Sequence, residues 1–90
     1  MYKIKRYSYI QAKKLGVEIK PSTRQGKKID VYRNGVKIAS IGAIGYKDYP
    51  TYIEQYGKAY ADNRRKLYYI RHNDDIKLGT PGYYAAKILW

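Results

Sequence analysis

The sequence predicts a single α+β domain over residues 1–90, with a short helix, a three-stranded antiparallel sheet, a long helix and a short last helix in that order. Three observations carry this prediction. Apolar and polar residues alternate over residues 17–20, 27–33 and 36–41, which is the period of half-buried strands. Asn34-Gly35 stands between two of these stretches as a two-residue turn. Apolar residues recur at helical spacing on both sides of the strand region.

The first predicted helix covers about residues 8–15. Ser8 and Gln11 have the spacing of a capping box, and Gly16 stands where a helix C-cap belongs. Lys13 and Lys14 fall in the last turn, where cations complement the helix dipole. For these two lysines, a role in the helix and a role in binding are equally open.

A three-stranded antiparallel meander is expected over residues 17–41. Pro21 ends the first strand or confines it to a sheet edge, because proline cannot donate to the ladder. Asn34-Gly35 predicts a type I′ hairpin turn, which needs positive φ at both central residues. The third strand is expected to carry Val36, Ile38 and Ser40 on one face.

A second helix is predicted from Thr51 to about residue 71. Thr51 and Glu54 again have capping-box spacing. Gly57 costs about 1 kcal/mol relative to alanine inside a helix, so a kink or a split is expected there. The apolar stripe of this helix is expected to consist of Ile53, Tyr56, Tyr60, Leu67 and Ile70.

The last helix is predicted to follow Thr80-Pro81, an N-cap residue with proline at the first helical position. Its end is strongly apolar. Ile88, Leu89 and Trp90 are therefore expected to dock on the sheet or on a partner chain.

The amino-acid composition argues against several classes of protein, namely disulfide-rich, zinc-binding, membrane-spanning and secreted proteins. The chain has no cysteine, which excludes a disulfide framework and a cysteine-ligated zinc site and fits a reducing cytosol or a particle assembled there. No apolar run approaches the roughly 18 residues of a membrane span. No apolar core follows the cations of the N-terminal stretch, so neither a membrane association nor a secretory signal is expected.

The net charge points to a polyanionic partner. Nineteen Lys and Arg stand against seven Asp and Glu, for a net charge of +12, which favours DNA, RNA or an acidic protein surface. Residues 1–28 hold nine cations and one anion, so the N-terminal third is the most positive part. The thirteen tyrosines suit boundary packing, protein interfaces or stacking on unpaired bases.

A second cationic cluster lies within residues 63–72. On a helix, Arg64, Tyr68 and Arg71 share one face, as do Arg65, Tyr69 and His72. Leu67 and Ile70 are expected to point to the core, which leaves the cations and tyrosines for phosphates. The alternative is a salt-bridged helix surface, since Asp62 stands three residues before Arg65 and four before Lys66. His72 can also serve as a cap of the helix C-terminus.

The groups that a catalytic or metal site needs are missing. The chain has one histidine, and Asp74-Asp75 is the only adjacent carboxylate pair. No nucleophile motif and no glycine-rich phosphate loop is present. We therefore expect no enzyme, no metal and no cofactor.

Two sets of candidate site residues follow. Nucleic-acid contacts are expected from the N-terminal cations, the hairpin region and the 64–72 face, that is from Lys3, Lys5, Arg6, Lys13, Lys14, Arg24, Lys27, Lys28, Arg64, Arg65, Arg71 and His72. Protein contacts are expected from the last helix through Tyr83, Tyr84, Leu89 and Trp90. A basic meander followed by a helix also resembles, in element order, the integrase and AP2 domains that insert a sheet in the major groove.

Four blocks of the chain, KPSTRQGKKIDVY, IGAIGYKDYP, RRKLYYIRH and GTPGYYAAKILW, carry a family resemblance. Residues 17–90 resemble a family of small basic proteins of unassigned function encoded by large DNA viruses and tailed, crAss-like bacteriophages. SYIQAKKLGV is similar to the phage-encoded members. Ile41 and Tyr84 stand where many relatives have phenylalanine and tryptophan, and both look like packing positions. The resemblance implies a viral or phage origin, and residues Arg64, Arg65, Lys66, Arg71 and His72 match its RRK…RH block.

The function expected first is non-catalytic binding of nucleic acid, duplex DNA above all, through phosphate contacts with little sequence reading. The alternatives are a minor capsid or capsid-cementing subunit that contacts viral capsid proteins or itself, and an inhibitor that covers an acidic host protein. The place of action would be the virion or the cytoplasm of the infected host cell.

Overall fold

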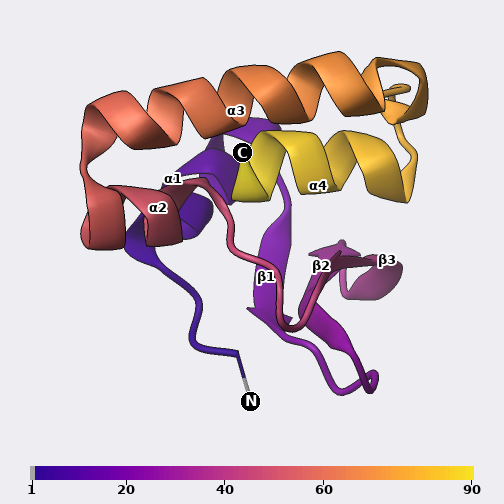
Figure 1. Ribbon diagram of the computed structural model, residues 1–90. Helices are drawn as coiled ribbons and strands as arrows, with labels where there is room; N and C mark the ends of the chain where they lie inside the picture. Colours follow the sequence, from indigo (N-terminus) through magenta and orange to yellow (C-terminus); the bar gives the residue numbers. More distant parts are fainter. Residues whose placement is uncertain (1) are drawn as a thin grey trace.

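Residues 2–90 are described by a computed structural model, and within them four α-helices accompany one three-stranded sheet (Figure 1). The predicted α+β class and order of elements are confirmed. The elements are α1 (Arg6–Leu15), β1 (Glu18–Pro21), β2 (Lys27–Arg33), β3 (Val36–Ala43), α2 (Tyr49–Tyr56), α3 (Lys58–His72), the 3-10 turn η1 (Asn73–Asp75) and α4 (Pro81–Leu89).

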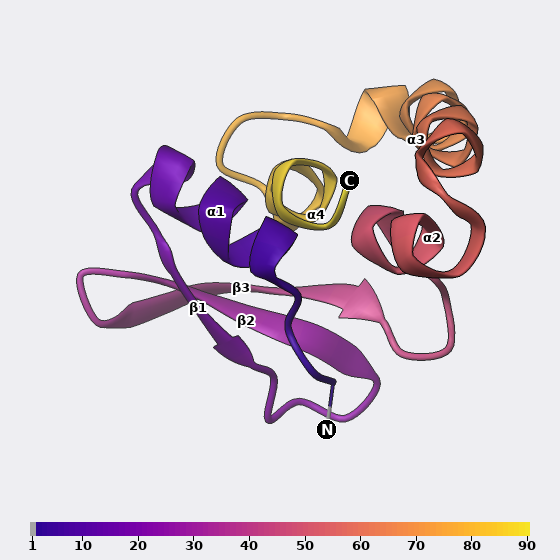
Figure 2. The same cartoon turned by 90° about the vertical axis from the view of Figure 1, so that its left-hand side faces the viewer.

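The sheet has the order β1-β2-β3, with antiparallel neighbours. Helices α1 and α4 lie side by side on one of its faces, and α2 with α3 lies beyond α4 (Figure 2). Ile29 and Val31 of β2 and Ile88 of α4 are completely buried between these layers. None of the helices within residues 2–90 combines the length and the apolar character needed to cross a membrane.

The β2–β3 turn forms as predicted. Asn34 has φ 52° and Gly35 has φ 79°, so both central residues adopt the positive φ of a type I′ turn. A bulge at the step from Val31 to Tyr32 inserts an extra residue in β3. Beyond it, the side chains of Ala39 and Ile41 face the core. Val36 and Ile38 lie on the solvent side, 63% and 38% exposed.

Helix α1 begins at Arg6, two residues before the predicted start. The predicted capping box is wrong because Ser8 lies inside the helix, where it is buried. Its Oγ donates a hydrogen bond of 2.8 Å to the backbone oxygen of Ile88, which joins α1 to α4. Gly16 forms the predicted C-cap with φ 72°.

The predicted split at Gly57 is confirmed. Gly57 separates α2 from α3 with φ 88° and ψ 168°, a conformation essentially restricted to glycine. The start of α2 differs from the prediction, because Asp48 and not Thr51 is its N-cap. Thr51 instead donates to the Asp48 carboxylate from its backbone N–H and its hydroxyl, at 3.1 and 2.6 Å.

The orientation predicted for the long helix is wrong. Leu67 and Ile70 are 37% and 64% exposed, and Tyr56 and Tyr60 are also exposed. The inward face of α3 carries the buried Ala61 and the half-buried side chains of Arg64, Arg65, Tyr68 and Tyr69. The small side chain of Ala61 lets the helix approach its neighbours. The tyrosines then fill the space between α3 and α4, where Tyr69 Oη donates to the Ala86 backbone oxygen at 3.0 Å.

Helix α4 forms as the sequence predicts. Thr80 is its N-cap and accepts a hydrogen bond from the Tyr83 backbone N–H, and Pro81 follows at the first helical position. Ile88 and Leu89 are buried in the core that the sheet and α1 complete. Docking of this segment on the sheet of its own chain is therefore confirmed.

Candidate nucleic-acid interface

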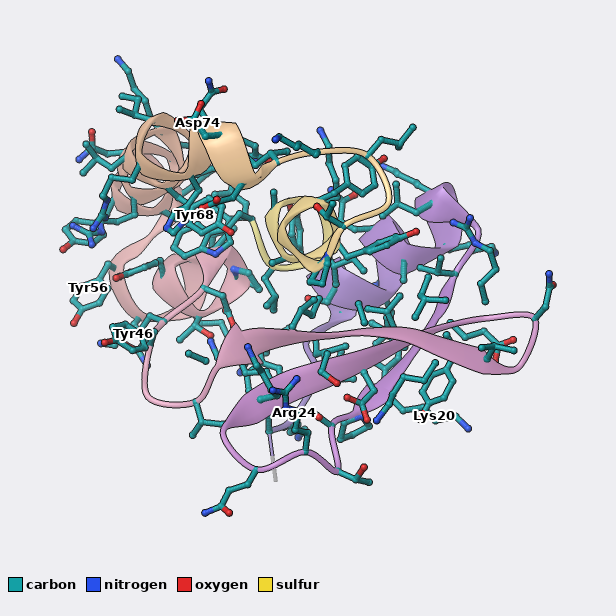
Figure 3. All side chains as sticks on the ribbon, turned by 90° about the vertical axis from the view of Figure 1, so that its right-hand side faces the viewer. Lys20, Arg24, Tyr46, Tyr56, Tyr68 and Asp74 are labelled. Atoms are coloured by element: carbon teal, nitrogen blue, oxygen red, sulfur yellow. The ribbon has the colours of Figure 1, made fainter. Side chains whose placement is uncertain are left out.

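Two adjoining cavities lie on either side of the β3–α2 loop, residues 44–48. The first, of about 820 Å³, is lined by the β1–β2 loop and the β3–α2 loop. The second, of about 490 Å³, lies between that loop, α3 and the end of α4. Both are lined by Lys28, Tyr46 and Lys47, and the two adjoining cavities together are called here the groove. In Figure 3, Arg24, Tyr46 and Tyr68 mark its course from the sheet toward α3.

Five cations line the groove without a carboxylate partner among residues 2–90. They come from three separate parts of the chain: Arg24 and Lys27 from the β1–β2 region, Lys47 from the β3–α2 loop, and Arg64 and Arg71 from α3. Lys28, which also lines the groove, is paired with Asp48, and outside the groove Lys5, Lys37, Lys58 and Arg65 form ion pairs. The groove therefore gathers positive charge that the fold leaves unneutralised.

A buried ion pair forms the floor between the two cavities. Lys28 Nζ lies 3.0 Å from Asp48 Oδ2, and both side chains are almost completely buried. Lys28 Nζ also donates to the backbone oxygen of Tyr46. Burial alone would raise the pKa of Asp48, but hydrogen bonds from Thr51 and Tyr2 and the charge of Lys28 outweigh it, so the pKa lies below its usual range.

The burial of Lys28 therefore argues against its predicted contact with nucleic acid. Its ammonium group is neutralised by Asp48 and closed off from solvent. The role that the structure gives Lys28 is to hold the β3–α2 loop against β2 through two acceptors on that loop. Reaching a phosphate would require breaking a desolvated ion pair, which costs several kcal/mol.

Stacked rings form the wall of the second cavity. The rings of Tyr68 and Trp90 are nearly parallel, with centroids 4.5 Å apart and an interplanar angle of 11°. His72 stacks on the other side of Tyr68, with centroids 4.4 Å apart. Tyr52 follows Trp90 at 6.0 Å in a tilted arrangement. The wall thus presents ring edges and faces of four residues from α2, α3, and the α4 C-cap position to one cavity.

The two neighbouring arginines of α3 have different environments. Arg64 lines the groove, and its guanidinium carbon lies 5.4 Å from the centre of the Tyr52 ring. Arg65 points to the other side, where it stacks on the Tyr49 ring at 4.1 Å and lies 3.6 Å from Asp62 Oδ1. The salt-bridge alternative therefore describes Arg65 in this structure, and its contact with nucleic acid stays a prediction.

Only part of the predicted nucleic-acid set converges. Lys5 pairs with Glu54 at 2.6 Å, and no N-terminal cation lines the groove. In Figure 2 the end of α1 that carries Lys13 and Lys14 lies at the opposite side of the molecule from the β3–α2 loop. The groove unites Arg24, Lys27, Lys28, Arg64, Arg71 and His72, and it leaves out Lys3, Lys5, Arg6, Lys13, Lys14 and Arg65.

The predicted protein-contact residues are largely internal. Tyr84 and Leu89 are 4% and 2% exposed, because they belong to the core of their own chain, which argues against their predicted contact with a partner. Tyr83 and Trp90 are half-buried and pack against the same core. Trp90 also lines the second cavity of the groove.

The outer face of the sheet is a poor surface for phosphates. Asp30 is completely buried on β2, where its carboxylate accepts hydrogen bonds from the hydroxyls of Ser22 and Ser40 at 2.6 and 2.7 Å. Burial alone would raise the pKa of Asp30, but these hydrogen bonds, the Thr23 N–H and the charge of Lys37 together lower it. The carboxylate therefore stays ionised in the middle of the face that a sheet-inserting domain would turn to DNA.

Sequence reasoning missed Tyr46, Lys47 and Tyr52. Tyr46 and Lys47 lie between the predicted meander and the predicted long helix, and Tyr52 lies outside the apolar stripe predicted for that helix. A signal was present in Gly45-Tyr46-Lys47, which places an aromatic ring and a cation next to a loop glycine with φ 98°. Binding residues are often carried by such loops.

A family described as one of unknown function (DUF5754) matches residues 17–52. This segment contains the sheet and the β3–α2 loop, so it includes Arg24, Lys27, Tyr46 and Lys47 of the groove. No curated protein and no solved structure matches the chain significantly.

Proposed function

We propose that the protein binds nucleic acid, without catalysis, through phosphates that lie in the groove. The observation that supports this proposal best is the convergence of Arg24, Lys27, Lys47, Arg64 and Arg71 on one depression, each without a carboxylate partner among residues 2–90. Arginine and lysine donors of this kind suit phosphate oxygens. A viral or phage origin is part of the proposal and rests on the four sequence blocks described above.

The number of groove cations sets the expected salt dependence. Each phosphate that is neutralised steepens the log–log dependence of affinity on salt by about 0.9 for duplex DNA and about 0.7 for a single strand. If all five cations contact phosphates, the slope is about −3.5 to −4.5. Affinity would then fall steeply between low and physiological salt.

The test compares two double variants that each remove two positive charges. Arg24→Ala with Arg71→Ala removes groove cations that are both exposed. Lys13→Ala with Lys14→Ala removes exposed cations of α1 outside the groove. Binding of a fluorescent oligonucleotide is followed at several salt concentrations. We expect the groove variant to flatten the slope by about 1.4 to 1.8 and the α1 variant to leave it nearly unchanged. Equal slopes in the two variants, or no salt dependence in the wild type, would refute the proposal.

A second candidate function is contact with protein in a virion, as a minor capsid or capsid-cementing subunit. It is favoured by the outer face of α3, where Leu67 and Ile70 are 37% and 64% exposed one helical turn apart. Ile70→Glu should abolish self-association or binding to a shell protein in sedimentation experiments if this face is the contact. A wild-type protein that sediments as a monomer and is missing from purified particles would exclude this function.

A further inference from the structure

The second cavity of the groove has the features of a site for a single nucleotide. Its volume of about 490 Å³ lies within the range of about 300–1,000 Å³ that is typical of small-ligand sites. One wall is the aromatic series of Tyr52, Trp90 and Tyr68, and the rim carries Lys47, Arg64 and Arg71. An aromatic wall beside a cationic rim suits a ligand that combines an aromatic ring with a phosphate.

Tyr46 adds a free ring at the entrance. It lines both cavities and is 76% exposed, the largest exposure of any tyrosine among residues 2–90 that the structure places at the surface. The other aromatic residues of the second cavity are stacked on one another, whereas no aromatic ring of the described chain pairs with Tyr46. Its face is therefore available to a base, and exposed aromatic faces of this kind are the platforms on which unpaired bases stack.

Arg64 supplies an unused hydrogen-bond donor. Its Nε is buried and has no acceptor among residues 2–90. Buried donors of this kind are rare in folded proteins, because leaving one unpaired carries a desolvation penalty. The guanidinium group lines the same cavity as the aromatic wall. Arg64 as a whole is only half-buried, so a phosphate in the cavity would be an acceptor for its guanidinium group.

Duplex DNA does not fit this arrangement. In a duplex the bases are stacked and paired, so their faces are not available to the second cavity, whereas unpaired bases can be splayed out and stacked on aromatic side chains. We infer that the groove binds a single strand, with one unstacked base in the second cavity beside Tyr46 and Trp90 and with flanking phosphates on the cations of the groove. This inference rests on the proposed function, and it replaces the duplex expected from the sequence by a single-stranded ligand.

Trp90 gives the inference a direct readout, because it is the only tryptophan of the chain and it lines the second cavity. The full chain is titrated with three ligands of equal length: a thymidine strand, the corresponding duplex, and a strand whose sugars carry no bases. We expect the thymidine strand to quench Trp90 fluorescence and to bind about 10-fold more tightly than the strand without bases, as stacking of one base gives. The duplex should bind more weakly than the thymidine strand and leave Trp90 fluorescence unchanged.

The variant Tyr46→Ala tests the entrance, with Tyr9→Ala as its matched control. Tyr9 is 49% exposed on α1 and lines neither cavity. We expect Tyr46→Ala to weaken binding of the thymidine strand about 10-fold, to leave binding of the strand without bases unchanged, and to keep the salt slope. Tyr9→Ala should match the wild type in all three respects. Equal losses in the two variants would overturn the inference.

The outcomes separate this inference from the proposed function. If all three ligands bind equally well with a steep salt slope, phosphate binding stands and the single-strand inference is overturned. If none of them binds in a salt-dependent manner, the proposed function itself fails. Thymidine monophosphate is added as a competitor, and displacement of the strand at an equal concentration of nucleotide would overturn the inference in favour of a site for free nucleotides.

Discussion

Replacing Asp48 by alanine should destabilise the protein by about 3–5 kcal/mol, because it leaves the buried ammonium group of Lys28 without a counter-charge. The carboxylate of Asp48 also accepts hydrogen bonds from the Tyr2 hydroxyl at 2.6 Å and from Thr51, for which it is the helix cap. Loss of an N-cap alone costs about 0.5–2 kcal/mol. These contributions overlap and are not additive. A loss of this size is a large fraction of the 5–15 kcal/mol of a typical domain.

The assay is urea unfolding, followed by Trp90 fluorescence and by far-ultraviolet circular dichroism. Asp62→Ala is the matched control, because Asp62 also accepts from a tyrosine hydroxyl and pairs with a lysine, but its side chain is 41% exposed. We expect a much smaller loss there, since solvent screens exposed ion pairs. The double variant Lys28→Met with Asp48→Ala should regain at least about 1 kcal/mol over Asp48→Ala. Equal losses for Asp48→Ala and Asp62→Ala, or no recovery in the double variant, would refute the reasoning.

Three further predictions concern other parts of the fold. Gly42→Ala should cost about 1–3 kcal/mol in the same unfolding assay, because a Cβ there would lie 2.7 Å from Leu89 Cδ1 at a φ of 77°, and an unchanged midpoint would contradict the packing. Ile70→Ala should cost less than about 0.5 kcal/mol, as a surface position does, whereas a core isoleucine would cost about 2–5 kcal/mol. Because the fold lowers the pKa of Asp30, its contribution to stability is complete above the unfolded value of about 3.9 and is lost as the pH falls through the folded value. Unfolding free energies measured from pH 6 to pH 3 should therefore fall more steeply in the wild type than in Asp30→Asn, and parallel curves would show that Asp30 does not contribute.

The features that the sequence predicts correctly are those that depend on a few adjacent residues. Asn34 and Gly35 form the predicted turn because their own backbone preferences match the twist of a hairpin. Gly57 interrupts the long helix because only glycine adopts its φ and ψ without strain. Thr80 and Pro81 start α4 for equally local reasons. Local chemistry of this kind acts before any tertiary contact is made.

The orientation of α3 could not be predicted from apolar periodicity. Leu67 and Ile70 are the most apolar side chains of the helix, yet they remain outside. Tyr68 and Tyr69 occupy the inner face, because their rings stack on Trp90 and reach a backbone oxygen of α4. The small side chain of Ala61 lets α3 pack closely, with tyrosines making the contacts to its neighbours. The positions of Leu and Ile in the sequence do not reveal this packing.

The sequence predicts residues of the candidate site correctly only where several Lys and Arg residues lie close together in the chain. Arg64 and Arg71 were identified because they belong to a conspicuous cluster, and Arg24 and Lys27 because they flank the sheet. Whether Arg64 or Arg65 would face the groove depends on the packing of α3, which the sequence alone misassigned. Lys28 is sequestered by Asp48, twenty residues away in the chain, and such distant partners are not visible in a local pattern.

The β3–α2 loop is held at two points by one lysine, since Lys28 donates to the Tyr46 backbone oxygen and to the Asp48 carboxylate. The exposed side chain of Tyr46 extends from this loop, and Lys47 donates from its Nζ to the Tyr56 hydroxyl at 3.1 Å. The backbone of this loop is therefore already ordered before a ligand binds, so binding costs little backbone conformational entropy. Selectivity then depends on the shape and charge of the ligand. The residence time of the ligand depends on how well its rings and anionic groups fit the preorganised site.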